Sequence, residues 1–331
     1  MATRVRLGLL GTGGIAHFHM SHITEIPEAE VVALADPQPA NTARLQEKYP
    51  ALAGLPSFGT LEQLLAGPEL DAVLIQTPHV GHVDQASACL RAGKHVLLEK
   101  PMAVSVAEAH ALLKAIGESG KLLSVSYQRH FQPQFRYIKQ AVDDGKLGKL
   151  TFVASQLSQD WLRGTTGSWR QDPAVSGGGQ ILDSGSHIVD IIMWVTGLRA
   201  RTVFGVLDNR GSPVDIDSAV SIAFEGGAMG TIAVVGDCPF WHEDHGFYGA
   251  EGAILYRNGK VYAQYRGGEF AEVTEFPSGT DPDRNFIAAI LGHEEIGSPA
   301  ECGLRVIELT EAVWASGRSG GAQAVAELPK S

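Results

Sequence analysis

The chain has 331 residues, of which 44% are hydrophobic and 19% charged, and its formal net charge is -11. These proportions are ordinary for a soluble globular protein, and the length suits two domains better than one core. A nucleic-acid partner is not expected, because such proteins usually carry a basic face. No run of about 18 apolar residues occurs, so no membrane-spanning helix is expected.

The three cysteines, Cys89, Cys238 and Cys302, are widely separated in the sequence. They form neither the close pairs of a metal site nor a disulfide framework. The apolar run at the N-terminus is too short for a secretory signal and leads directly into glycines. We therefore expect a cytoplasmic protein with no bound metal.

Short apolar strands alternate with helical segments in the first part of the chain. Strands are expected at residues 4–11, 29–36, 70–78, 94–101 and 121–128, and helices at 13–26, 39–49, 80–93 and 105–120. This alternation indicates a parallel sheet covered on both faces, with right-handed crossovers. The expected fold class is α/β, with an N-terminal doubly wound Rossmann domain over residues 1–126.

The turn after the first strand reads GTGGIA, a GxGxxA pattern over residues 11–16. Gly11 permits a tight turn, Gly13 lets a pyrophosphate approach the backbone, and Ala16 allows close packing of helix on strand. The helix that follows offers free N–H groups to the phosphates. The second strand ends in Asp36, where a carboxylate binds the adenosine ribose of a dinucleotide. The alternative is a tight turn followed by an ordinary loop aspartate.

Asp36 also bears on the choice of dinucleotide. Its carboxylate accepts hydrogen bonds from ribose hydroxyls and repels a 2′-phosphate. Residues 37–40 read PQPA and supply no cation to offset that repulsion. NAD is therefore favoured as the cofactor, and NADP is disfavoured.

The strict alternation stops at about residue 127, and a domain over 127–331 is expected. Strands are predicted at 150–158, 201–208, 217–225 and 228–236, with a hairpin at 253–265 and helices at 283–293 and 304–318. Gly226-Gly227 and Asn258-Gly259 are hairpin turn signals. These features indicate a large, open, mainly antiparallel sheet in a second α/β domain.

The segment at 176–197 holds a candidate acid–base group. On a helix, Asp183, His187, Asp190 and Trp194 would fall on roughly one stripe. A carboxylate one turn from a histidine can fix its tautomer and raise its basicity, as a general base requires. The alternative is a helix-capping network after a Gly-rich turn.

Five other histidines invite a functional interpretation. His242 and His245 belong to WHEDH, which we expect to be a loop, and their HxxH spacing differs from the HExxH of zinc proteases. A pocket rim or a subunit contact is favoured over a metal site. His17, His19 and His22 lie on the first helix, where packing and solvent exposure are the default interpretation.

The stretch HVLLEKPMA at residues 95–103 places Glu99, Lys100 and Pro101 at the end of an apolar strand. Proline cannot continue a central strand, so the strand should end here. One interpretation is a surface ion pair followed by a turn, and the other is a functional lysine.

Several segments together resemble the Gfo/Idh/MocA oxidoreductases, which include inositol and glucose dehydrogenases. The motifs that carry the resemblance are GTGGIA at 11–16, ADP at 35–37, TPHVGH at 77–82, AGKHVLLEKP at 92–101, SWR at 168–170, GGGQILDSGSH at 177–187 and NFIAAILG at 285–292. The resemblance covers almost the whole chain. It implies a Rossmann domain followed by an α/β domain whose open sheet forms oligomer contacts.

The resemblance also implies a catalytic group. Lys100 is similar to the family's active-site lysine, positioned between nicotinamide and substrate, and its bond to Pro101 is often cis in the family. Asp183 and His187 match the pair that completes the group. Glu99 is similar to a residue near the nicotinamide ribose. Lys100 would then stabilise the developing alkoxide, and His187 would accept the proton.

Other matched positions imply contacts with cofactor and substrate. Trp169 and Arg170 match the family's Trp-Arg pair and join Lys100, Asp183 and His187 as the implied substrate-binding residues. The implied cofactor-binding residues are Gly11, Thr12, Gly13, Gly14, Ile15, Asp36, Thr77, Pro78, His79, His82, Glu99, Lys100 and Gln128. Family members commonly carry Asn where this chain has His79, so that contact departs from the pattern.

The expected function is transfer of a hydride between NAD and a secondary alcohol of a sugar, inositol or related polyol. Two alternatives are an NAD-using enzyme that cleaves glycosidic bonds and a non-catalytic, nucleotide-bound sugar sensor. A homodimer or homotetramer is expected through the second sheet. Phe204, Val206, Ile222 and Phe224 are candidates for its uncovered face.

Overall fold

The computed structural model describes residues 4–325, which fold into two compact units. The first unit comprises residues 4–103, 107–128 and 280–301. The second comprises residues 104–106, 129–279 and 302–325. The stretch 280–301 therefore belongs with the first unit and not, as expected, with the second, because Phe286 and Ile287 pack into the core beneath the first sheet.

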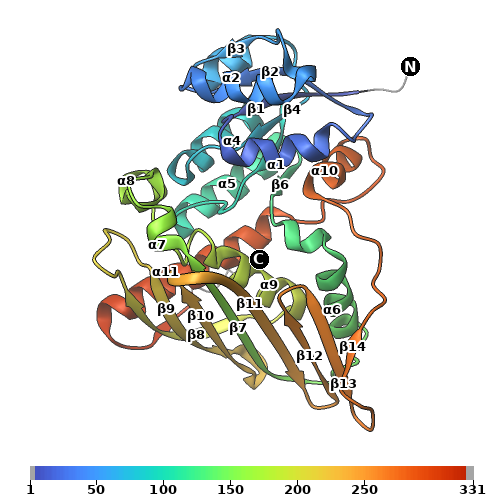
Figure 1. Ribbon diagram of the computed structural model, residues 1–331, viewed down its shortest axis with the longest axis vertical. Coiled ribbons are helices and arrows are strands. Elements are labelled where there is room, and N and C mark those ends of the chain that lie inside the picture. Colours follow the sequence, from blue (N-terminus) through green and yellow to red (C-terminus); the bar gives the residue numbers. More distant parts are fainter. Residues whose placement is uncertain (1–3, 326–331) are drawn as a thin grey trace. The chain divides into compact units, whose positions relative to one another are not determined.

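The first unit is built on a six-stranded parallel sheet (Figure 1). In chain order its strands are β1 (Val5–Leu10), β2 (Ala29–Ala35), β3 (Ser57–Phe58), β4 (Ala72–Ile75), β5 (His95–Leu98) and β6 (Leu123–Val125). Their spatial order is β3-β2-β1-β4-β5-β6. This is the Rossmann arrangement, which places a ligand at the carboxyl ends of the strands where the order reverses.

Helices flank this sheet. They are α1 (Gly14–Ile23), α2 (Pro39–Lys48), α3 (Leu61–Ala66), α4 (His82–Arg91), α5 (Val106–Ser119) and α10 (Pro282–Ile290), with short 3-10 turns η1 (Pro50–Leu52) and η2 (His79–Gly81). A third 3-10 turn, η3 (Gln128–Phe131), begins at the last residue of the 107–128 stretch and continues into the second unit. The central strands are buried along nearly their whole length, as expected for a parallel sheet covered on both faces. Strand β3 and helix α3 were not predicted, because they are too short to show a clear periodicity.

The second unit contains a nine-stranded, mainly antiparallel open sheet. Its strands are β7 (Leu150–Asp160), β8 (Ala200–Asp208), β9 (Asp217–Phe224), β10 (Met229–Val235), β11 (Asp237–Gly249), β12 (Gly252–Arg257), β13 (Lys260–Tyr265), β14 (Ala271–Val273) and β15 (Gln323–Ala324). Their order is β14-β13-β12-β11-β7-β10-β9-β8-β15, and only β7 and β10 pair in parallel. The predicted fold class is confirmed in both units.

Helices cover one face of this second sheet (Figure 1). The helical segments of the unit are α6 (Pro133–Asp143), α7 (Trp161–Gly164), η4 (Trp169–Gln171), α8 (Pro173–Ser176), α9 (Gly185–Thr196), η5 (Glu225–Gly227) and α11 (Ala300–Ser319). Helix α9 packs on β7 and β10, and α11 packs closely on Gly205 of β8. Within residues 4–325, every helix is too short or too polar to cross a membrane.

The predicted hairpin turns are present, but the face assignment was partly wrong. Asn258 and Gly259 both adopt positive φ, as a two-residue hairpin turn requires. Phe204 and Val206 are 42% and 58% exposed, whereas Ile222 and Phe224 are buried. Residues directly opposite each other in a sheet share a face, and Ile222 lies opposite the buried Val203.

Candidate functional site

The loop after β1 is shaped to receive a dinucleotide. Gly11 has φ of 89°, and a Cβ atom there would lie 2.6 Å from the carbonyl oxygen of Gln76. At Gly13 and Gly14 a Cβ atom would meet nothing within 4 Å. The loop is therefore packed tightly against the end of β4 on one side and open where α1 begins. A pyrophosphate fits this open side, beside the N–H groups of the helix N-terminus.

Asp36 is buried immediately after β2, and both of its carboxylate oxygens already accept hydrogen bonds. Oδ2 accepts from the backbone N–H of Thr12 at 2.8 Å, and Oδ1 accepts from that of Gln38 at 2.8 Å. The Asn41 amide lies 3.2 Å from Oδ1 and also contacts Arg44. Arg44 is therefore a cation near this site. It was not considered when NAD was predicted from the sequence, because only residues 37–40 were taken as neighbours of Asp36.

The loop that follows β4 holds the next group of predicted cofactor residues. Thr77 and Pro78 lead into η2, whose first residue, His79, is buried. The His82 ring is also buried, and its nitrogens lie 2.8 Å from the carbonyl oxygen of Thr77 and 2.7 Å from that of Pro101. Burial lowers the pKa of His82. This ring thus connects the loop after β4 to the backbone after β5.

The Glu99-Lys100-Pro101 segment follows β5 at the same edge of the sheet. The peptide bond between Lys100 and Pro101 is cis, as the resemblance implied. Glu99 is 7% exposed, and its Oε2 accepts the backbone N–H of Lys100 at 3.2 Å. A buried carboxylate therefore precedes the lysine, which is inconsistent with a simple surface ion pair. Gln128, half-buried, begins η3 after β6, and Ile15 is 38% exposed on α1.

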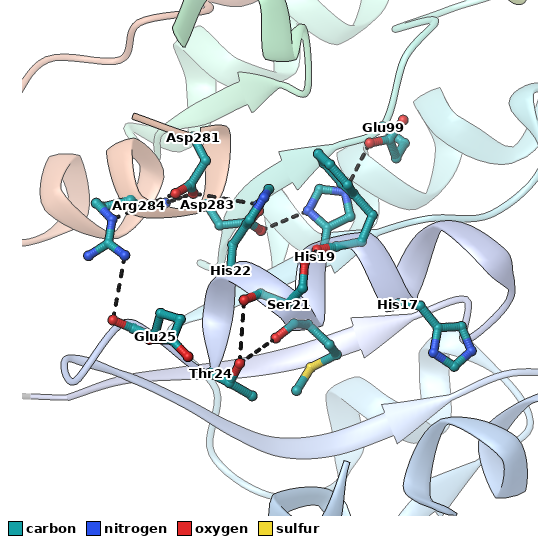
Figure 2. Close-up of polar contacts among 12 residues, drawn as sticks. His17, His19, Ser21, His22, Thr24, Glu25, Glu99, Asp281, Asp283 and Arg284 are labelled. Carbon is teal, nitrogen blue, oxygen red and sulfur yellow. Dashed lines mark hydrogen bonds and ion pairs between the residues drawn. The ribbon is translucent and has the colours of Figure 1, made fainter. Parts of the chain in front are cut away.

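One group of charged residues in this unit was not predicted from the sequence (Figure 2). The His19 ring lies between the carboxylates of Glu99 and Asp283, and His22 contacts the same aspartate. Packing or solvent exposure was expected for His19 and His22. The i, i+3 spacing of these histidines was visible in the sequence, but their partner Asp283 lies more than 260 residues away along the chain.

In the second unit, Asp183 lies in the turn before α9 and not on the helix, so the predicted helical stripe begins two residues too early. Its Oδ2 accepts from the Trp161 indole N–H at 3.0 Å and from Arg170 Nε at 3.1 Å. The Arg170 guanidinium also lies over the Trp169 ring, 4.6 Å from its centroid. The predicted residues Trp169, Arg170 and Asp183 are therefore neighbours.

Two residues of the predicted helical stripe, Asp190 and Trp194, contact a further histidine, His130. Asp190 contacts Nε2 of the buried His130 at 2.9 Å, and Trp194 stacks on that ring with centroids 4.1 Å apart. Burial raises the pKa of Asp190. Asp190 and Trp194 thus form a cluster around His130. His187 is half-buried in the first turn of α9.

WHEDH is not a loop, because it lies within the long strand β11 beside β7. The buried Glu243 accepts two hydrogen bonds from Arg129, each of 2.8 Å, and lies 3.0 Å from His245 Nε2. Nδ1 of His245 is 2.9 Å from the Ser155 hydroxyl. His242 is partly exposed and contacts Asn258. Glu243 and His245 are therefore core residues and not the rim of a pocket.

A Rossmann sheet with an open glycine loop, an acidic residue after β2 and a lysine after β5 defines a nucleotide-dependent oxidoreductase. Comparison with known families agrees with this class. Residues 5–127 match the model of the oxidoreductase family with an NAD-binding Rossmann fold, and residues 135–255 match the Gfo/Idh/MocA C-terminal domain. The chain belongs to the Gfo/Idh/MocA family and is an NAD-binding oxidoreductase.

Individual relatives are similar over most of their length. The scyllo-inositol 2-dehydrogenase (NAD(+)) of Bacillus subtilis is 27% identical over 77% of this chain and 74% of its own. The myo-inositol 2-dehydrogenase of Thermotoga maritima is 28% identical over 69% of this chain and 67% of its own. A levoglucosan dehydrogenase solved with NADH shares the fold, with a TM-score of 0.89, 20% identity and coverage of 98% of this chain and 100% of its own.

Proposed function

We propose that the protein is an NAD-dependent dehydrogenase that oxidises a secondary alcohol of a sugar, an inositol or a related polyol, or catalyses the reverse reduction. The observation that carries the proposal is the position of Lys100. It follows β5 at the same sheet edge as the Gly11–Ala16 loop, immediately after the buried Glu99. The inositol dehydrogenases among the relatives support the substrate class.

The reaction requires removal of a hydroxyl proton while a hydride leaves the same carbon. NAD supplies the hydride acceptor when it is bound, and the protein orients the reactants and handles the proton. Gly13 and the first turn of α1 would hold its pyrophosphate, and Asp36 its adenosine ribose. Thr77, His79 and the carboxylate of Glu99 would line its nicotinamide end.

Lys100 would donate a hydrogen bond to the substrate oxygen and stabilise the developing alkoxide. His187 would accept the hydroxyl proton, and Asp183, in the turn before α9, would be the carboxylate that orients it. Asp183 already holds Arg170 through the 3.1 Å contact to Nε, so Arg170 is oriented to bind a substrate hydroxyl or carboxylate. The contact of Arg170 with Trp169 restricts the guanidinium further.

NAD should be preferred over NADP. Asp36 is buried, and its hydrogen bonds to the backbone N–H groups of Thr12 and Gln38 fix its carboxylate close to the ribose position. Arg44 lies near Asn41 on α2 and moderates the repulsion of a phosphate, but it is exposed. The expected preference is therefore moderate.

A homodimer or homotetramer should form through the uncovered face of the second sheet. This face exposes Phe204, Val206 and Tyr248 around a shallow hollow of about 540 Å³. Apolar patches of this kind are uncommon on the surface of a monomer. Light scattering of the purified protein would measure the assembly, and a monomer at micromolar concentration would contradict it. The double variant Phe204→Lys, Val206→Lys should be a monomer in the same measurement.

The test of the reaction is a substrate panel. Purified protein with NAD should be offered inositols, aldoses, anhydrosugars and sugar acids, and NADH formation followed by absorbance. Stoichiometric NADH with one class of polyol supports the proposal. Turnover of a glycoside without net NADH indicates the glycoside-cleaving alternative, and tight NAD binding without any turnover indicates a sensor.

A further inference from the structure

Three structural elements of the first unit meet around the imidazole of His19 (Figure 2). His19 lies on α1, three residues after the Gly11–Ala16 loop. Its Nε2 is 2.9 Å from Oε1 of Glu99, at the end of β5, and its Nδ1 is 2.7 Å from Oδ1 of Asp283, on α10. All three side chains are almost fully buried, with exposures of 1%, 7% and 2%.

The hydrogen-bonding pattern specifies the charge of this group. Ionised carboxylates only accept hydrogen bonds, and an imidazole donates from both nitrogens only when it is protonated. A cation between two anions also removes much of the cost of burying each carboxylate. Both contacts are satisfied together when His19 is an imidazolium and Glu99 and Asp283 are both ionised.

Each neighbouring element contributes groups that bear on this assignment. On α1, His22 Nδ1 lies 2.8 Å from Oδ2 of Asp283, and on α10 Asp283 lies in the first turn, where the helix dipole favours an anion. Asp281 caps that helix and pairs with Arg284, and it lies 3.7 Å from His22. After β5, Lys100 is the cation next to Glu99, and Ser126 lies near Glu99 at the end of β6.

We propose that His19 is a positioning residue of the active site, which acts by holding Glu99 ionised and in one orientation beside Lys100. One oxygen of Glu99 faces His19, and the other accepts the backbone N–H of Lys100. The carboxylate is thus held at both ends. Asp283 holds the opposite side of the ring, so α10 contributes to the cofactor site through His19.

The titration behaviour of the three groups agrees with this geometry. The flanking carboxylates outweigh burial and raise the pKa of His19 to about 10. Hydrogen bonding to His19 and the charges of His19 and Lys100 lower the pKa of Glu99, although burial acts in the opposite direction. Glu99 is therefore ionised throughout the neutral range while His19 is present and charged.

The inference rests on the proposed function in assigning Glu99 to the nicotinamide end of NAD. If His19 is removed, Glu99 keeps its burial but loses its buried cationic partner. Its pKa should then rise, and protonation would remove an acceptor from the cofactor site. NAD binding, which is expected to be nearly independent of pH in the wild type, should become weaker as the pH falls.

The first test uses the wild-type protein. Imidazole nitrogen chemical shifts from NMR, assigned by comparison with His19→Gln or, if that variant does not fold, with His19→Asn, report whether each nitrogen carries a proton. Two protonated nitrogens on His19 at about pH 8, well above the ordinary histidine pKa, are expected. A neutral ring with a single protonated nitrogen at that pH would overturn the proposal.

The second test measures NAD affinity by fluorescence titration between about pH 8 and pH 6 in three variants. For His19→Gln, the dissociation constant should increase up to about tenfold per pH unit below the new pKa of Glu99. Asp283→Asn should show a smaller change in the same direction. His22→Gln, which leaves the Glu99 contact intact, is the matched control and should follow the wild type.

A purely structural role for His19 predicts a different outcome. If the ring only ties α1 to α10, His19→Gln would lower the melting temperature but leave the pH dependence of NAD affinity like that of the wild type, which contradicts the proposal. Glu99→Gln should bind NAD weakly at every pH, and adding His19→Gln should introduce no further pH dependence. None of these measurements uses a polyol, so a failed substrate panel would refute the proposed reaction without deciding the role of His19.

Discussion

The two units each bury a carboxylate against a histidine, but they do so in different settings. In the second unit, Glu243 accepts a bidentate pair of hydrogen bonds from Arg129, and His245 lies beside it on the same strand. In the first unit, Glu99 contacts an imidazolium that comes from another element and is followed directly by Lys100. Both carboxylates have lowered pKa values, and that of Glu243 falls to about 2.

The difference shows how the same chemistry serves two purposes. Arg129 donates a hydrogen bond to each carboxylate oxygen of Glu243. Both charges of this pair are thus balanced within the second unit, and the pair serves the stability of the fold. Glu99 instead joins α1, α10 and the segment after β5, close to the predicted nicotinamide position. A perturbed pKa is therefore insufficient to identify a functional residue, and the neighbouring groups decide between the two roles.

The largest expected effect comes from breaking the network in the second unit. Arg129→Met leaves Glu243 buried without its bidentate partner, which should lower the free energy of unfolding by about 3–5 kcal/mol in urea titrations. The matched control is Arg163→Met, whose exposed pairs with Asp160 and Asp237 should contribute about 0–1 kcal/mol. Equal losses in the two variants would show that the buried pair has no special stabilising role.

Replacing the lysine after Glu99 should affect catalysis and not stability. Lys100→Met should reduce kcat on the true substrate by about 10² or more, as for the loss of one oxyanion donor. NAD affinity should change little, because the loop at Gly11–Ala16 and Asp36 remain. Lys114→Met, at an exposed pair on α5, is the control. A folded Lys100→Met enzyme with unchanged kcat would remove Lys100 from the mechanism.

His187 should act on the same proton as Lys100. His187→Ala should lower kcat, and raising the pH should restore part of the activity as hydroxide replaces the base. The double variant Lys100→Met, His187→Ala should lose less than the product of the two single losses, because both residues serve one proton transfer. Losses that multiply without any rescue by hydroxide would assign the two residues to separate steps.

The charge of His19 predicts how stability depends on pH. The pKa of His19 is raised from 6.5 to about 10 on folding. The contribution of its charge to the free energy of unfolding is therefore complete below about pH 6.5 and declines as the pH rises toward 10. The free energy of unfolding should therefore decrease between pH 6.5 and pH 9, and this decrease should be reduced in His19→Gln. The buried Cys89 thiol, whose pKa is raised by burial from its ordinary 9.0, also lowers stability as the pH approaches 9, but it does so equally in the wild type and in His19→Gln. An identical slope in both proteins would show that His19 is not charged in the native state.

The smallest expected effect concerns cofactor choice. Asp36→Ala removes the charge that repels a 2′-phosphate and should narrow the gap between NAD and NADP affinity by up to about tenfold, or about 1.4 kcal/mol. Adding Arg44→Gln should weaken NADP binding again. Fluorescence titration of both dinucleotides gives the comparison, and wild-type binding of NADP as tight as NAD would contradict the assigned role of Asp36.

Prediction from the sequence was most accurate where the decisive interactions are local. The alternation of strands and helices, the glycine turn before α1 and the hairpin at Asn258-Gly259 follow from periodicity and from backbone conformations that few residues adopt. Errors arose where side chains choose among distant partners. WHEDH was expected to be a loop, but Arg129, far away in the sequence, pairs with Glu243 inside the sheet.

The sequence by itself determined the Rossmann order of elements, the dinucleotide loop and the family to which the chain belongs, because each is encoded in short motifs and local backbone preferences. Tertiary structure alone decided which charged residues meet. Asp190 faces His130, and Asp283 reaches His19 across more than 260 residues of sequence. The physical reason is that a buried charge requires a partner, and residue spacing along the chain does not reveal which partner the fold brings within hydrogen-bonding distance.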